Sequence, residues 1–460
     1  MRKVLPLICF IICMSAQTLP ADELRGGWVT AWNKGLFTQS QADATISDAK
    51  RAGLNALLVQ VRKVGDAYYE SSIEPRGDNL ASGFDPLAYM VKTGHSSGIQ
   101  VHAWVNICRI WREKEPPIDP KHIVNRHPEW LNVDYGGHSR ASDGMFLDPG
   151  VPEAREYTAS LVADIAKRYD IDGIHLDYIR YPGKEWGYSP TALARYRAET
   201  GASGKPKPED RKWLRWRAEK VTEMLGLIRK RVRAVKPNVV ISAATVTWGD
   251  CCPSFSENLA CKLTCQDWND WLDTGLLDAN VPMNYRSESS SKSAAQFRAW
   301  LNGFKKWNGG RPTYVGLDVH NNNSAGIVRQ IEAVRKAGLQ GYVLFSFNES
   351  ALRNATVAAL AKQHPNTGNA GSIEVIASRQ MFDKGVRCAM ANQLGMAEVY
   401  FKKAVELEPG YIEAHFRLGR VYLRERNYAS AKEEFEAVLK LDPTHSGAKA
   451  ELDAMKLNLD

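Results

Sequence analysis

The chain has 460 residues, of which 44% are hydrophobic and 24% charged, and its formal net charge is +8 at pH 7. Its length exceeds what one hydrophobic core usually supports, so we expect at least two domains. The composition is that of a globular protein and argues against a disordered or a membrane protein. The modest positive charge, spread along the chain, argues against nucleic-acid binding.

The first 21 residues have the pattern of a signal peptide. Arg2 and Lys3 form a basic start, residues 4–14 are apolar, and residues 19–21 offer a cleavage site. The apolar run is too short to cross a bilayer as a helix. We therefore expect an exported protein, periplasmic or extracellular, that has no membrane span once the signal is removed.

Strand patterns then alternate with helical patterns along most of the chain. Strands are expected at 25–32, 56–62, 100–108, within 171–182, and at 239–248, 279–285, 313–319 and 341–348. Helices are expected at 41–52, 86–95, 152–169, 209–236, 268–277, 297–307 and 327–337. This alternation predicts an α/β fold, a (β/α)8 TIM barrel over residues 22–362.

The pattern changes after the barrel. Residues 363–377 are polar and rich in Gly and Asn at their start, as a linker is. Residues 378–411 and 412–445 have the spacing of 34-residue tetratricopeptide repeats, and 446–460 fit a capping helix. We expect a small all-α domain that binds a protein partner on its concave surface.

A TIM barrel places its functional side chains at the C-terminal ends of its strands. The residues expected there mix aromatic rings with carboxylates, amides and guanidinium groups. Rings of this kind stack on the apolar faces of sugars, so we predict a polysaccharide substrate. The candidate substrate-binding residues are Trp32, Arg62, Asp66, Trp104, Asn106, Arg180, Trp248, Asn284, Tyr285 and Asp318.

Glycoside hydrolysis generally uses two carboxyl groups. Asp177, which ends the apolar stretch from residue 171, is the first candidate, because Arg180 nearby favours its ionised form as nucleophile or electrostatic stabiliser. Glu349 and Asp250 are candidates for the second catalytic group, and Asp318 also lies at a suitable strand end. For each of these three, a solvated loop carboxylate is the alternative.

Two further aspartates have competing interpretations. Asp66 either binds a sugar hydroxyl or pairs with Arg62, and Asp148 equally fits an N-cap of the following helix, which the residues alone favour. No HExxH, GxSxG or GxxxxGK[ST] motif occurs in the sequence, which lowers the odds for zinc proteolysis, serine hydrolysis and nucleotide hydrolysis. We expect neither a cofactor nor a metal.

Four cysteines crowd into one short segment: Cys251, Cys252, Cys261 and Cys265. In an oxidising compartment this crowding predicts local disulfides, with three possible pairings. A zinc site is the rival interpretation, although the segment lacks the paired CxxC spacing of most such sites.

Many ordered segments resemble one family. They are RGGWVTAW, ALLVQVRKVGDAYY, QVHAWVN, HPEWLN, FLDPGVPEAREY, YDIDGIHLDYIRYP, WRAEKVTEMLGLIRKRVRAVKPNVVIS and QDWNDWLDTGLLDANVPMNY. They resemble the glycosyl hydrolase-like 10 domain of bacterial exported proteins over about residues 23–350. The resemblance implies a (β/α)8 barrel, and the family includes an envelope enzyme that cuts peptidoglycan glycan strands stripped of stem peptides. It also implies that Arg62, Asp66, Asp148, Asp177 and Tyr285 lie in the cleft.

The sequence therefore predicts an exported glycoside hydrolase, with peptidoglycan glycan as the expected polysaccharide and Asp177 as one catalytic carboxylate. The alternative is a non-catalytic glycan-binding barrel that the repeats tether to an envelope or exopolysaccharide assembly complex. In a third interpretation the repeats carry the main function: the chain is a scaffold for exopolysaccharide or envelope machinery, and the barrel is the recruiter.

Overall fold

The computed structural model describes residues 23–349, 356–360, 373–443 and 445–457. The expected signal peptide, residues 1–21, lies outside these ranges, as does most of the expected linker. No helix of the described ranges is long and apolar enough to cross a membrane.

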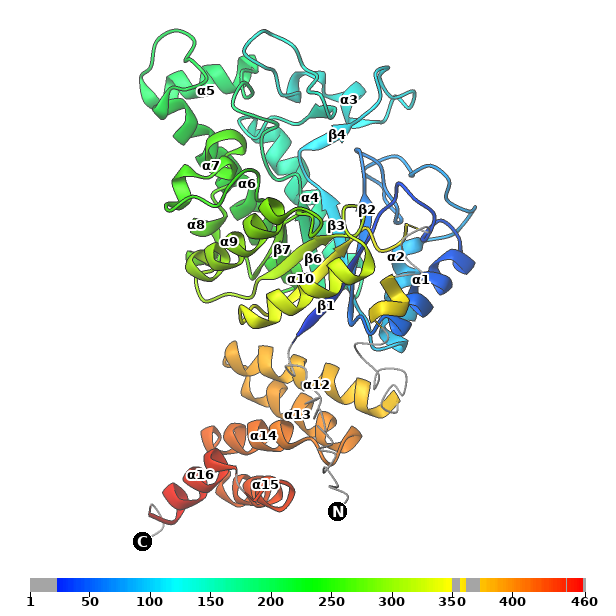
Figure 1. Ribbon diagram of the computed structural model, residues 1–460, viewed down its shortest axis with the longest axis vertical. Coiled ribbons are helices and arrows are strands. Elements are labelled where there is room, and N and C mark those ends of the chain that lie inside the picture. The colour runs from blue at the N-terminus through cyan, green and yellow to red at the C-terminus, as the bar shows by residue number, and fades with distance from the viewer. Residues whose placement is uncertain (1–22, 350–355, 361–372, 444, 458–460) are drawn as a thin grey trace, which may run out of the picture.

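Eight parallel strands form a closed barrel (Figure 1). They are β1 (Leu24–Val29), β2 (Ala56–Arg62), β3 (Gln100–Asn106), β6 (Gly173–Asp177), β7 (Val240–Val246), β8 (Ala279–Met283), β9 (Tyr314–Asp318) and β10 (Gly341–Phe345). Pairing of β10 with β1 closes the ring. The predicted (β/α)8 barrel is confirmed.

Helices surround the barrel: α1 (Gln39–Arg51), α2 (Pro86–Ser96), α4 (Pro152–Arg168), α6 (Arg211–Val235), α8 (Trp268–Asp273), α9 (Ser291–Trp307) and α10 (Ser324–Lys336). Side chains cap the first turns of several of these helices. Thr38, Asp85, Asp210 and Ser290 each accept a hydrogen bond from a backbone N–H of the first turn, which satisfies a donor that the helix leaves unpaired.

The barrel interior is packed with aromatic rings. Trp28 donates a hydrogen bond from Nε1 to Nε2 of His175, 3.0 Å away, and His175 Nδ1 lies 3.0 Å from Ser242 Oγ. Burial holds the pKa of His175 well below its ordinary value, so the imidazole is neutral. A Cβ on Gly316 would lie 2.9 Å from the Trp28 ring, so glycine makes room for the indole.

Several elements were not expected from the sequence. The connection after β3 forms a small antiparallel sheet of β4 (Arg109–Trp111) and β5 (Met145–Phe146), and α5 (Pro190–Thr200) follows β6. Figure 1 shows β4 and α5 at the end of the barrel opposite the C-terminal helices. This long connection therefore stands over the mouth where the strands end.

From residue 373 on, the described ranges contain the helices α12 (Ile373–Met390), α13 (Leu394–Leu407), α14 (Ile412–Arg424), α15 (Tyr428–Leu441) and α16 (Ser446–Leu457). Glycine allows each pair to pack closely, because a Cβ on Gly385 would meet Phe401 at 2.6 Å and one on Gly419 would meet Phe435 at 2.7 Å. These helices have a hydrophobic core separate from that of the barrel. Since α12 begins at Ile373, the last five residues of the expected linker are helical.

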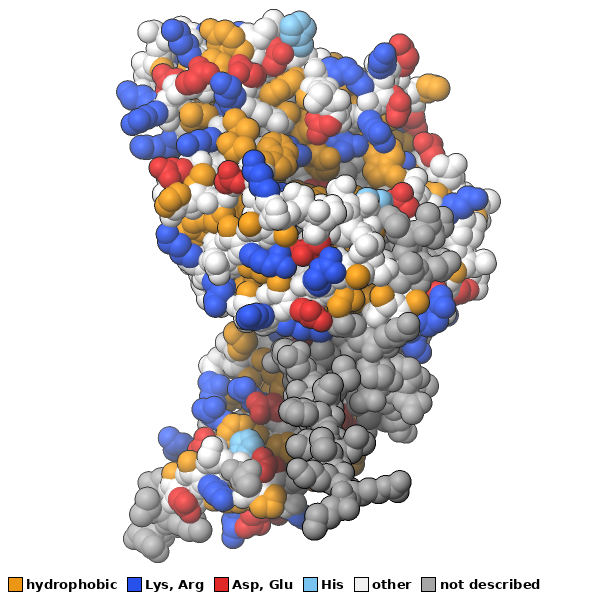
Figure 2. Space-filling view, viewed as in Figure 1, with side chains coloured by type: hydrophobic (Ala, Val, Ile, Leu, Met, Phe, Trp, Pro, Cys, Tyr) orange, Lys and Arg blue, Asp and Glu red, His pale blue; other side chains and the backbone are white. Residues whose placement is uncertain are grey.

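Charged side chains are distributed over the surface. Figure 2 shows Lys and Arg interspersed with Asp and Glu across the visible face of the barrel, with hydrophobic side chains between them. On this face the net positive charge does not gather into one broad patch.

Candidate active site

Asp177 ends β6 at the barrel mouth and is 7% exposed. Its Oδ2 accepts a hydrogen bond from Trp104 Nε1 at 3.1 Å, and its Oδ1 accepts one from the Tyr178 N–H at 2.7 Å. Burial raises the pKa of Asp177 above its ordinary value, although Arg180 and these two donors oppose the rise. Arg180 lowers the pKa of Asp177, as expected from the sequence, but desolvation has the larger effect and the net shift is upward.

A row of alternating rings and guanidinium groups crosses the mouth beside Asp177. Tyr178 lies between Arg109, 4.8 Å from its ring centroid, and Arg180, 4.6 Å away. Arg109 also lies 5.5 Å from the Trp32 ring, and Arg180 lies 5.2 Å from the Trp248 ring. The two tryptophans are 37% and 40% exposed, so each offers an open platform on one side of Asp177.

The backbone at Tyr178 is part of this arrangement. Its φ is +52°, in the left-handed region that non-glycine residues rarely adopt. This conformation lets the Tyr178 N–H reach the carboxyl group of the preceding residue, while its hydroxyl accepts a hydrogen bond of 2.6 Å from Arg109. Such local strain is common at functional sites.

The opposite side of the mouth is acidic. Burial raises the pKa of Tyr285 well above its ordinary value, and the nearby carboxyl groups of Asp177 and Asp318 raise it further. Both carboxyl groups are thus near enough to act on Tyr285 electrostatically, and its ring stacks on Phe345 with 5.3 Å between the ring centroids. Asp318 accepts hydrogen bonds from the His320 N–H at 2.8 Å and from the side chain of Asn321.

Glu349 lies between Asp318 and the segment that follows β1. Its Oε2 is 3.3 Å from His320 Nε2, 3.2 Å from Ser346 Oγ and 3.3 Å from Asn33 Nδ2, and its side chain is 41% exposed. His320 in turn lies 6.0 Å from Phe345, the ring that stacks on Tyr285. Glu349 thus joins the cluster through His320, whereas Asp318 acts on Tyr285 electrostatically.

Asp250 does not join this cluster. It is exposed and accepts a hydrogen bond of 2.6 Å from Gln296 on α9. The structure therefore does not bring Asp250 together with Asp177, because the loop after β7 turns its carboxyl group toward α9.

Four other predicted residues support the walls of the cleft and do not reach its surface. Arg62 is fully buried and donates to Glu74 through Nε at 2.8 Å and Nη2 at 2.7 Å, and also to the carbonyl groups of Asn106 and Ile107. Burial alone would lower the pKa of Arg62, but Glu74 raises it above its ordinary value. Asn106 is also buried, and its Nδ2 donates to the Lys63 carbonyl at 2.7 Å.

Asp148 and Asn284 are fully buried as well. Asp148 Oδ1 accepts hydrogen bonds from the Gly150 N–H at 2.8 Å and the Tyr181 hydroxyl at 3.2 Å. The N-cap interpretation is wrong, because Val151 caps α4 and Asp148 instead fixes the turn before it. Asn284 donates to the Phe297 carbonyl at 3.2 Å.

Asp66 closes its own loop. Its Oδ1 accepts hydrogen bonds from the N–H groups of Lys63 at 3.0 Å and Val64 at 2.8 Å, and Lys63 Nζ lies 3.8 Å from its Oδ2. Burial raises its pKa while Lys63 lowers it. Asp66 therefore pairs with Lys63, and the expected pairing with Arg62 does not occur.

Several residues of the site were not among the candidates: Lys63, Glu74, Arg109, Arg112 and Phe345. Arg109 and Arg112 directly follow the third strand in the segment ICRIWR, so their position at a strand end was a usable signal. Glu74 offered none, because it meets Arg62 from a loop twelve residues later in the chain.

The cysteine segment is not disulfide-bonded. Cys251, Cys252, Cys261 and Cys265 are all free, so the expected disulfides are wrong. The thiols have different surroundings: Cys252 Sγ faces the Asp250 and Glu257 carbonyls, Cys261 Sγ faces the Gln266 carbonyl, and Cys265 is buried. Among the described residues, no group of three or more His, Cys, Asp or Glu is placed to hold a metal ion.

Comparison with known families agrees with this geometry. Residues 23–325 match the model of the family described as glycosyl hydrolase-like 10. The chain belongs to this family. Residues 412–445 match the tetratricopeptide repeat model, which coincides with the second predicted repeat.

Two relatives show how far the similarity of this family member extends. Glycosyl hydrolase YngK of Bacillus subtilis is 28% identical over 335 residues, covering 65% of this chain and 62% of YngK. Glycosyl hydrolase DigH of Escherichia coli is 26% identical over 273 residues, covering 54% of this chain and 58% of DigH. The chain thus spans about three fifths of each relative.

Solved structures share the fold of this glycosyl hydrolase-like 10 barrel. An alpha-L-fucosidase from Paenibacillus thiaminolyticus aligns with a TM-score of 0.54 at 14% identity, covering 75% of this chain and 50% of the other. The PgaB glycoside hydrolase domain from Bordetella bronchiseptica aligns with a TM-score of 0.52 at 15% identity, covering 76% and 98%. At such identities the likeness concerns the barrel alone.

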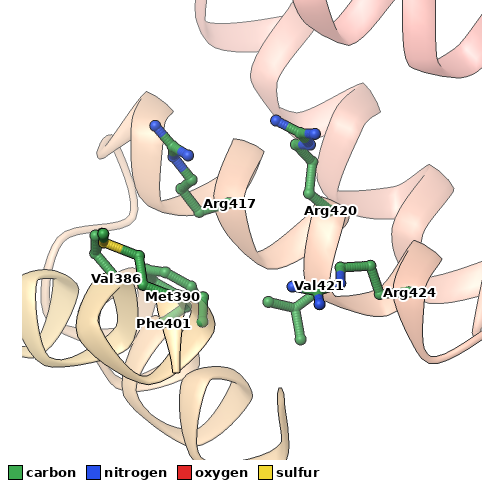
Figure 3. Close-up of a pocket in the computed structure, with 8 residues that line it drawn as sticks. Val386, Met390, Phe401, Arg417, Arg420, Val421 and Arg424 are labelled. Atoms are coloured by element: carbon green, nitrogen blue, oxygen red, sulfur yellow. The ribbon is translucent and has the colours of Figure 1, made fainter. Parts of the chain in front are cut away.

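A second candidate site lies on the repeats. Side chains of α12, α13 and α14 line a pocket of about 220 Å³. Figure 3 shows Met390 and Phe401 on one side, facing Val421 and Arg424 of α14 on the other. Arg417 and Arg420 extend the basic edge along α14.

Proposed function

We propose that the chain is an exported glycoside hydrolase that cuts a polysaccharide of the bacterial envelope, namely peptidoglycan glycan strands. One observation carries the proposal: a buried carboxyl group, Asp177, lies beside a row of rings and guanidinium groups that ends in an exposed tryptophan on each side, and a second carboxyl group, Asp318, lies near the same tyrosine, Tyr285. Two tryptophans that each stack on a sugar ring hold the glycosidic bond between those sugars over Asp177.

The environments of the two carboxyl groups favour different roles. The raised pKa of Asp177 keeps it protonated to higher pH than an ordinary aspartate, as a proton donor to the glycosidic oxygen requires. Asp318 accepts two hydrogen bonds and acts as the partner that supports the positive charge developing on the sugar. This assignment makes Asp177 the acid and replaces Glu349 with Asp318 as the second group.

The test is the release of reducing ends from peptidoglycan glycan strands. Asp177→Asn and Asp318→Asn should each lower the rate by at least about a hundredfold. Asp250→Asn is the matched control, because its carboxyl group faces α9, and it should keep the wild-type rate. An inactive Asp250→Asn variant together with an active Asp177→Asn variant would reverse the assignment.

A non-catalytic glycan-binding barrel is the second candidate. It is favoured by the hydrogen bonds that already engage both oxygens of Asp177, from Trp104 and from the Tyr178 N–H. Retained binding of the glycan with no release of reducing ends by the wild-type protein would select this function.

We further propose that the repeats bind a protein partner through the pocket between α12 and α14. Its apolar floor suits a hydrophobic side chain, and the arginines Arg417, Arg420 and Arg424 favour an acidic partner. Proteins captured from an envelope extract should be lost when Arg420 and Arg424 are both changed to Glu, while the barrel keeps its activity.

A further inference from the structure

Three cations converge on one exposed ring at the cleft. Lys63 Nζ lies 4.6 Å from the Trp32 ring centroid, and the guanidinium carbons of Arg112 and Arg109 lie 4.9 Å and 5.5 Å away. Lys63 directly follows β2, Arg109 is the first residue of β4, and Arg112 directly follows β4. Since Trp32 remains 37% exposed, a ligand that reaches it also meets these charges.

Most of this charge is not neutralised. Lys63 has Asp66 at 3.8 Å. Arg109 donates a hydrogen bond to the Tyr178 hydroxyl, and its buried Nε has no hydrogen-bond partner in the described ranges. The guanidinium of Arg112 is exposed and forms neither a hydrogen bond nor an ion pair with any described residue. Within the described ranges, these two guanidinium groups therefore have no carboxylate at ion-pair distance, although Arg109 is near enough to Asp177 to lower its pKa.

The two sides of the mouth differ in charge. Trp32 has the basic cluster, whereas Asp318 ends β9. Glu349, which follows β10, lies between them, with its Oε2 3.3 Å from Asn33 Nδ2 and 3.3 Å from His320 Nε2. A ligand with a negative group is attracted to the Trp32 side and repelled from the other. The charge distribution therefore sets the direction in which an acidic chain lies across Asp177.

We propose that the cleft binds a carboxylate-bearing sugar, stacked on Trp32 with its carboxylate held by Arg112 and Arg109. This inference rests on the proposed function, because it names the substrate class of the same site. The planar fork of a guanidinium matches the two oxygens of a carboxylate. The carboxylate comes either from the lactyl group of muramic acid or from a uronic acid, and the experiment separates these sources.

The experiment measures equilibrium binding to the full chain carrying Asp177→Asn, so that hydrolysis does not consume the ligand. The ligands are peptidoglycan glycan strands without stem peptides, the same strands with their carboxyl groups converted to methylamides, polygalacturonate and its methyl ester. Loss of the carboxylate should weaken binding about tenfold at low salt, and the difference should shrink as salt screens the charges.

Variants of Arg112 locate the effect. Arg112→Gln should weaken binding of the acidic ligand about fivefold and leave the methylamide or ester unchanged, and Arg112→Lys should restore part of the loss. Arg215→Gln is the matched control, because Arg215 is an exposed arginine on α6. Equal binding of the acidic and neutral ligands by the Asp177→Asn chain would overturn the inference.

The outcomes remain separable from those of the proposed function. Selectivity for the glycan strands alone assigns the lactyl carboxylate, and selectivity for polygalacturonate alone assigns a uronic acid. Acid-selective binding without any hydrolysis by the wild-type chain would end the hydrolase proposal and keep this inference. Equal rates of hydrolysis of the free and the methylamidated strands would keep the hydrolase proposal and end this inference.

Discussion

Replacing Glu74 with Gln tests whether Arg62 is a structural residue. Both side chains are buried, and the guanidinium contacts the carboxylate through Nε at 2.8 Å and Nη2 at 2.7 Å. Glutamine preserves the shape and one acceptor but leaves a buried positive charge unpaired. Removing one partner of such a pair costs about 3–5 kcal/mol. We expect the lower end, about 3 kcal/mol, because the carbonyl groups of Asn106 and Ile107 still accept from Arg62.

The assay is thermal unfolding followed by near-ultraviolet circular dichroism at a fixed scan rate. A loss of about 3 kcal/mol lowers the midpoint by about 5–10 °C in a domain of this size. Glu70→Gln is the control, because Glu70 is exposed and pairs with Arg76 only at 3.5 Å, so its midpoint should barely change. A Glu74→Gln protein with an unchanged midpoint and no glycan binding would refute the structural role.

Three further predictions follow from the same contacts. Trp104→Phe removes a hydrogen bond that lowers the pKa of Asp177, so this pKa rises further. Since a general acid is active when protonated, the alkaline limb of the pH–rate profile should move to higher pH, and an unmoved limb would contradict the assigned role. The hydrogen bond to Asp172 raises the pKa of His95 above 6.5. The pair therefore contributes stability that is complete below pH 6.5 and lost as the pH rises through the raised pKa. The stability advantage of the wild type over His95→Gln should fall by about 1 kcal/mol across that window, and a constant difference would refute it. Ending the chain at residue 362 should leave a folded barrel with its activity, because the repeats have their own core; aggregation of the shortened chain would show that the barrel needs them.

The order of elements was predictable because hydrophobic periodicity is a local property. The strand expected at 56–62 has the same bounds in β2, and the other seven strands lie within or close to their expected ranges. The β4–β5 sheet was not predictable, because its strands are only three and two residues long and pair across a long connection. The frame of the repeats was visible because in each repeat a glycine of one helix faces a phenylalanine of the next helix.

The candidate site was predictable in part. Position at a strand end correctly placed Trp32, Asp177, Arg180, Trp248, Tyr285 and Asp318 at the mouth. It did not show which way a side chain points, so Arg62 and Asn106, which turn into the wall, were included with them. Proximity in sequence also failed for the cysteines, whose thiols face different neighbours within one segment. The pKa of Asp177 depends on its burial, which its own neighbours in sequence did not reveal.

The central claim is that water adds across a glycosidic bond held over Asp177. The most direct measurement is mass spectrometry of the fragments that the chain releases from peptidoglycan glycan strands in water enriched in heavy oxygen. We predict fragments that carry heavy oxygen at their new reducing ends with the wild type, and none with Asp177→Asn. Labelled fragments from both proteins, or fragments without the label, would contradict hydrolysis by Asp177.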